Sequence, residues 1–164
     1  MSETNNATVQ DLANAVRGDL QAFSRLQRQS HEEIQAARYS LSEARVTAQD
    51  VGRVLADLLE RKISTEQAQS WAFFIRHGYM GHWQSRPITD EMRRDFKRAD
   101  SRLLTVHQAV ASGHSGPIRP IDIDYDPAAE DSIADAIARL DDIHSELFGL
   151  PTESEITELL RTLA

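Results

Sequence analysis

The sequence predicts an all-α fold, a bundle of about five or six helices. Apolar residues recur at steps of three and four over most of the 164-residue chain, which is the period of a helix with one buried face. Helix-start signals, in which a hydroxyl residue is followed three positions later by an acid or an amide, also recur. One short extended segment is predicted near residues 118–125, where apolar and acidic residues alternate strictly.

Length and composition favour a single helical domain over residues 1–164. The chain is 40% hydrophobic but only 6% aromatic, so its core should contain few large side chains. No stretch approaches the roughly eighteen apolar residues of a membrane span, and the first ten residues lack the features of a signal peptide. Because cysteine is absent, disulfides and thiolate zinc sites are excluded. We expect a soluble, cytoplasmic protein that does not bind a membrane.

The N-terminal quarter is predicted to be one long helix over residues 8–46, after a frayed segment at residues 1–7. Gly18 would weaken the interior of this helix, and Ser30 falls where an apolar residue is expected, so a break near residue 30 is the alternative.

The apolar stripe of this helix, which includes Leu20 and Phe23, has two interpretations. Its steps drift from a strict heptad, which favours packing against the core of the same chain. The alternative is a homodimer formed through the N-terminal helix.

Capping boxes predict the starts of three further helices. The pairs that form them are Thr47 with Asp50, Ser64 with Gln67, and Thr152 with Glu155. The first of these helices should end near Lys62 and the second near Gly78. Trp71, in the second helix, is expected to anchor the core because large aromatic residues at helical spacing usually do so.

A helix is also predicted from Thr89 to Gly113, followed by a loop and the extended segment over residues 113–126. One face of this helix carries the main basic concentration of the chain: Arg93, Arg94, Lys97, Arg98 and Arg102. Acidic residues lie at helical spacing from these cations, so a solvated, ion-paired face is favoured over an anion site.

The last third of the chain is strongly acidic. Residues 117–164 contain 12 Asp and Glu against 3 Lys and Arg, and the whole chain has a formal net charge of −8. Asp126 and Pro127 form a strong helix start, and the helix should continue to about Leu147. Opposite its apolar side, the helical period predicts an acidic stripe of Asp131, Asp135, Asp142 and Glu146. In the extended segment, Asp122 and Asp124 share the exposed face with Asp126.

These carboxylates do not match a known metal motif. An EF-hand needs glycine at the sixth and glutamate at the twelfth loop position, and the chain has Pro127 and Ile133 there. His77 and His82 are expected in a glycine-rich loop, where a surface or capping role is favoured over a metal site. No phosphate-binding or nucleophile motif occurs. We therefore expect no cofactor and no enzymatic activity.

Part of the chain resembles a known family. The stretch from Gly52 to Tyr79 has a leucine-rich helix, a short turn and a second helix opened by a glutamate and a Trp-Ala pair: Leu55, Leu58, Leu59, Ile63, Ser64, Glu66, Trp71 and Ala72. It is similar to small bacterial immunity proteins of the colicin D immunity-like kind, and the segment after Asp126 is similar to the tail of such sequences. The resemblance implies a helical bundle that neutralises a nuclease toxin by occluding its basic, RNA-facing cleft.

We therefore expect a non-enzymatic, acidic binding protein with a basic protein partner. An acidic chain gains nothing from displacing counterions of a phosphate backbone, so nucleic acid is not the expected partner. The expected partner-binding residues are the carboxylates and loop aromatics Asp122, Asp124, Asp131, Asp135, Asp142, Glu146, Tyr79, Trp83 and Tyr125. A self-associating structural or regulatory protein is the alternative, and a metal-dependent enzyme or sensor is the least favoured class.

Overall fold

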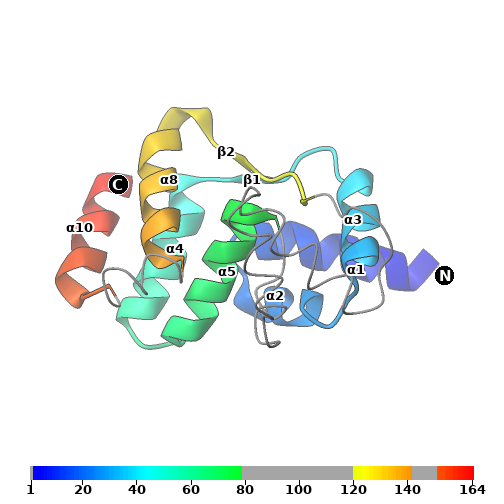
Figure 1. The fold of residues 1–164 in the computed structure, drawn as a ribbon, viewed down its shortest axis with the longest axis horizontal. Helices are drawn as coiled ribbons and strands as arrows, with labels where there is room; N and C mark the ends of the chain where they lie inside the picture. Colours follow the sequence, from blue (N-terminus) through cyan, green and yellow to red (C-terminus); the bar gives the residue numbers. More distant parts are fainter. Residues whose placement is uncertain (1, 79–119, 142–150) are drawn as a thin grey trace, which may run out of the picture.

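The protein is a mainly α-helical bundle, as the sequence predicts (Figure 1). The computed structural model describes residues 2–78, 120–141 and 151–164, with side chains from residue 6 onward. These three ranges contain seven α-helices, one 3-10 turn and two short strands, against about five or six helices expected. The helix predicted from Thr89 to Gly113 lies outside the described residues.

The single long helix predicted over residues 8–46 is wrong. Three helices occupy this part of the chain: α1 (Ser2–Val16), α2 (Leu20–Leu26) and α3 (His31–Ser40). The start of α1 at Ser2 also differs from the frayed segment expected over residues 1–7.

Both breaks have local causes. Gly18 adopts a left-handed conformation, with φ +93°, directly after α1. The N–H of Asp19 then bonds the carbonyl of Asn14, and the N–H of Gly18 bonds that of Ala15, which is the pairing of a Schellman C-cap. The Asp19 carboxylate caps α2, and the Ser30 hydroxyl caps α3. These terminal signals outweigh the apolar period that continues across them.

The next two helices begin where the capping boxes predict. They are α4 (Ala48–Leu59) and α5 (Thr65–His77), and each box is formed in both directions between side chain and backbone. Gly78 closes α5 in a left-handed conformation. These starts were predictable because each depends on residues only three positions apart.

From residue 120, where the described range begins, the chain forms the predicted extended segment, but the sequence does not predict its pairing. Strand β2 (Asp124–Tyr125) pairs in parallel with β1 (Arg45–Val46), which falls inside the range predicted to be helical. The alternation of the segment is confirmed, since Asp122 and Asp124 are exposed whereas Ile121 is buried and Ile123 is half-buried.

The chain then turns into its last two described helices. A 3-10 turn, η2 (Pro127–Ala129), is capped by the Asp126 carboxylate and leads into α8 (Glu130–Leu140). The predicted continuation of this helix to Leu147 is wrong, because α8 ends at Leu140 and Asp141 has an extended ψ of 139°. The final helix, α10 (Glu153–Leu163), begins at the predicted Thr152 capping box.

The helices form two groups (Figure 1). Helices α2 and α3 pack on α1, whereas α4, α5, α8 and α10 pack on one another, and α2 touches α5 between the groups. Trp71 is fully buried at this junction and donates its indole N–H to the Ala15 carbonyl at 2.7 Å, which confirms its predicted role in the core. Leu20 and Phe23 are also buried, so these two side chains are not exposed for the contact that the homodimer alternative requires.

Candidate functional site

Four of the predicted carboxylates lie on the surface. Asp122 and Asp124 are exposed on the segment that contains β2, and Asp131 and Asp135 are exposed one turn apart on α8. We call these four residues the acidic surface. The opposite side of α8 is buried through Ile133, Ala136, Ile137 and Leu140. Burial of this apolar side keeps Asp131 and Asp135 turned toward solvent.

Within the described ranges, the carboxylates of the acidic surface have no ion-pair partner. Ion pairs in the described ranges involve other acidic residues, such as Asp11, Glu43, Glu60 and Glu155, and none involves a member of the acidic surface. Unpaired, exposed carboxylates are free to interact with a cationic partner and attract it over a distance of about one Debye length, roughly 8–10 Å at physiological salt.

The remaining predicted partner-binding residues have different positions. Asp142, Glu146, Tyr79 and Trp83 lie outside the described residues. Tyr125 is half-buried on β2, and burial raises the pKa of its phenol, an effect to which the negative charge of Asp141 adds and which the positive charge of Arg76 opposes. Tyr125 therefore belongs as much to the packing under β2 as to the surface.

Tyr125 borders a polar cluster that joins the ends of α5 and α8. The Asp141 side chain is fully buried, and its Oδ2 atom lies 2.8 Å from Nε2 of His77 and 3.2 Å from Nη1 of Arg76. His77 also packs its ring on Phe73, with centroids 4.6 Å apart. A buried carboxylate requires such partners, because desolvation of an unpaired charge is costly.

This cluster corrects the expectation for His77. The sequence predicts a loop histidine, whereas the structure places His77 at the last position of α5, where it bonds a buried carboxylate. Within the described ranges, no group of three or more histidine and acidic side chains could hold a metal ion. His82 lies outside these ranges.

The sequence contains a signal for the burial of Asp141. Asp141 falls four positions after Ile137 on the apolar side of the helical period, and an acid at such a position predicts a buried, partnered carboxylate. Its partners Arg76 and His77 are more than sixty positions away in sequence, so they could not be inferred from spacing.

A second residue missed from the sequence is Tyr39, near the end of α3. Its side chain is 74% exposed, and it is the one large hydrophobic residue with high exposure among the described residues. The neighbouring Arg38 donates from Nε to the Asp122 carbonyl at 2.6 Å, which holds the end of α3 against the segment that contains Asp122 and Asp124. Exposed aromatic side chains are frequent anchors in protein interfaces.

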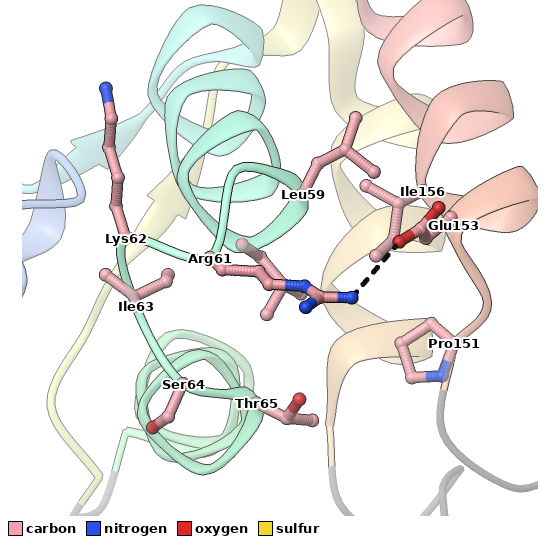
Figure 2. Close-up of a pocket in the computed structure, with 10 residues that line it drawn as sticks. Leu59, Arg61, Lys62, Ile63, Ser64, Thr65, Pro151, Glu153 and Ile156 are labelled. Carbon is pink, nitrogen blue, oxygen red and sulfur yellow. Dashed lines mark ion pairs between the residues drawn. The ribbon is translucent and has the colours of Figure 1, made fainter.

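A groove lies on another part of the surface, between the α4–α5 turn and the start of α10 (Figure 2). Its volume is about 510 Å³, and Leu58, Leu59, Ile63 and Ile156 provide apolar lining. Figure 2 shows the Arg61 side chain extending across the groove toward Glu153, with the charged atoms 3.9 Å apart. Both side chains are highly exposed, so this ion pair contributes little to stability.

Comparison with protein-family models, curated proteins and solved structures finds no match for this chain. In the three described ranges, no helix has both the length and the apolar character needed to cross a membrane.

Proposed function

We propose that this protein is a non-enzymatic binding protein that neutralises a basic nuclease toxin by covering its RNA-facing cleft. The role is that of an immunity protein in the bacterial cytoplasm. The observation that carries the proposal is the acidic surface, in which four exposed carboxylates have no ion-pair partner within the described ranges.

Electrostatic complementarity links this surface to the proposed partner. A nuclease binds a polyanion, so its cleft presents cationic side chains, and carboxylates held on a protein surface can occupy the same positions as phosphates. Opposed charges raise the association rate and set the orientation of the complex. The helical fold agrees with the one implied by the resemblance to colicin D immunity-like proteins, which supports the proposal.

A charge-matched pair of double variants tests the proposal. Asp131→Asn with Asp135→Asn removes two charges from the acidic surface, whereas Glu33→Gln with Glu66→Gln removes two exposed charges from α3 and α5. The ligand is the product of a gene next to that of this protein, made in a catalytically inactive form where that product is a nuclease. Kinetic binding measurements should show at least about a tenfold loss of affinity for the first variant, mainly in the association rate, and little change for the second.

Two further measurements complete the test. Binding should weaken as salt is raised, and the protein should inhibit RNA cleavage by the active nuclease at equimolar concentration. The proposal fails if the neighbouring product neither binds nor is inhibited. Equal effects of the two double variants would contradict the role of the acidic surface.

A further inference from the structure

The groove between the α4–α5 turn and the start of α10 has the size and lining of a small-molecule site. Its volume of about 510 Å³ lies within the range of about 300–1,000 Å³ that such sites occupy. Sites of this kind combine an apolar lining with a few polar or charged groups that orient the ligand. The apolar lining is formed by four side chains, Leu58, Leu59, Ile63 and Ile156. The charged groups are Arg61 and Glu153, which face each other across the groove (Figure 2).

Arg61 is held over the groove by a strained main chain. Its φ of +61° lies in the left-handed region, which is unfavourable for any residue with a side chain. The side chain does little for the fold in return, since it is 87% exposed and its guanidinium donates no hydrogen bond within the described residues. Strained residues cluster at ligand sites, so an arginine in this conformation points to a role for its charge in the groove.

The ion pair between Arg61 and Glu153 leaves both groups available to a ligand. Their charged atoms are 3.9 Å apart, which is longer than the roughly 2.7–3.2 Å of a hydrogen bond. The N–H donors of the guanidinium and the oxygens of the carboxylate can therefore bond a third molecule. Both side chains are highly exposed, so they can also shift to meet it.

The charge at the groove selects a ligand that carries both signs. Lys62 also borders the groove, but its ammonium lies 2.9 Å from the Glu60 carboxylate, and Figure 2 shows this side chain running away from the groove. Arg61 and Glu153 thus present one positive and one negative charge side by side. A ligand with a single charge would be attracted by one of them and repelled by the other, whereas a zwitterion is attracted by both.

The spacing of the pair matches an α-amino acid. Because one Cα atom separates them, the ammonium nitrogen and the carboxylate oxygens of an amino acid are about 3 Å apart. With Arg61 and Glu153 3.9 Å apart, the ligand carboxylate can lie on the guanidinium while the ligand ammonium lies on the carboxylate. The side chain of the ligand then enters the apolar part of the groove, where a large apolar group removes most surface from water.

We infer that this groove binds a free α-amino acid with a large apolar side chain. Arg61 binds its carboxylate, Glu153 binds its ammonium group, and the apolar lining holds its side chain. None of the four carboxylates of the acidic surface lines the groove, so the inference goes beyond the proposed function and does not depend on it.

A series of four small molecules tests the inference on the unchanged protein. L-Phenylalanine carries all three features, whereas 3-phenylpropionate lacks the ammonium group, 2-phenylethylamine lacks the carboxylate and L-alanine lacks the large side chain. An NMR titration with phenylalanine should give saturable shifts of the Ile63, Thr65 and Glu153 amides, with a dissociation constant of about 1 mM or tighter. Each of the other three compounds should bind at least about tenfold more weakly.

Variants of the pair provide a second readout. Arg61→Gln and Glu153→Gln each remove one charge, and the first keeps the Cβ atom and with it the main-chain strain. Each should weaken phenylalanine binding at least about tenfold. The matched controls are Arg161→Gln and Glu158→Gln, which remove the members of another exposed ion pair farther along α10 and should leave the affinity unchanged. The amide spectrum of each free variant shows whether it is folded.

Several results would overturn the inference. These are the absence of saturable shifts with phenylalanine, shifts confined to residues outside the groove, and equal affinities for phenylalanine and 3-phenylpropionate. Equal losses in Arg61→Gln and Arg161→Gln would also contradict it. The ligand series decides the matter even where a variant fails to fold, because it uses the unchanged protein.

Discussion

Arg61 ends α4 in a conformation that glycine adopts more easily. Its φ is +61°, and it is the one residue other than glycine with a positive φ among the described residues. The N–H of Lys62 bonds the Asp57 carbonyl, and the N–H of Arg61 bonds that of Leu58, so the C-cap is the same Schellman motif that Gly18 forms after α1. A side chain at this position destabilises the turn by about 1–2 kcal/mol.

We predict that Arg61→Gly stabilises the protein by about 0.5–1 kcal/mol, because the relief of the left-handed strain exceeds the added entropy of the unfolded chain. Urea unfolding measures the change. The matched variant Arg61→Ala loses the ion pair with Glu153 but keeps the Cβ atom, so it should not be stabilised. Equal stability of the two variants would contradict the assignment of strain to the backbone.

At the scale of single residues, the two Schellman caps show what sequence can predict. Gly18 was available as a helix stop, since glycine followed by the cap residue Asp19 is the usual pattern for one helix ending and another beginning. The apolar period continues across Gly18 and predicts a single helix, and this prediction is wrong. Arg61 carries no such signal, because an arginine seldom adopts the left-handed conformation and so does not mark a helix stop.

Gly78 connects two elements that are distant in sequence. It closes α5 with φ +78°, and its carbonyl accepts from the Ile121 N–H at the start of the segment that leads to β2. A Cβ atom at Gly78 would lie 2.6 Å from the Ile121 carbonyl oxygen, closer than folded proteins permit.

We predict that Gly78→Ala destabilises the protein by at least about 2 kcal/mol, through the left-handed backbone and this contact. The control is Gly52→Ala inside α4, where the nearest atom to the new Cβ would be Leu160 Cδ2 at an ordinary 3.9 Å. That variant should be about 1 kcal/mol more stable, because alanine favours a helix interior over glycine. Thermal unfolding of both variants tests the prediction, and a neutral Gly78→Ala would contradict it.

At the scale of elements, local signals were predictable and distant pairings were not. The starts of α4, α5 and α10 follow from hydroxyl and carboxyl or amide groups three positions apart. Strand β1 has only two residues, and its partner β2 is far along the chain, so no local pattern marks it. In the candidate site, the exposed face of α8 could be predicted from the helical period. The burial of Asp141 could not be predicted in this way, because it depends on contacts with residues of α5.

At the scale of the whole molecule, an ion pair between α8 and α10 makes the stability of the fold depend on pH. Arg139 binds the Glu155 carboxylate through two nitrogens, at 2.7 and 3.1 Å. This hydrogen bond, with another from the Thr152 backbone, lowers the pKa of Glu155. The pair stabilises the fold above the ordinary pKa of a glutamate, and the stabilisation is lost as pH falls through the lowered value.

We therefore expect the urea midpoint of the protein to fall as the pH decreases from neutral through the range below about 4.5. Glu155→Gln should show a smaller decrease over the same range, because it has no carboxylate to protonate. Arg139→Gln should show the same reduced pH dependence, since it removes the partner that lowers the pKa. A Glu155→Gln curve parallel to that of the unchanged protein would contradict the assignment.

The parallel pairing of β1 with β2 also determines the order in which the chain can fold. The pairing joins Val46 to Tyr125, so it closes a loop of about eighty residues, and closure entropy must be overcome before the contact is formed. The contacts of α1 with α2 and α3, and of α4 with α5, involve much shorter loops and form first. We therefore expect the segment with Asp122 and Asp124 to reach its final position late in folding, after most of the helices that support it.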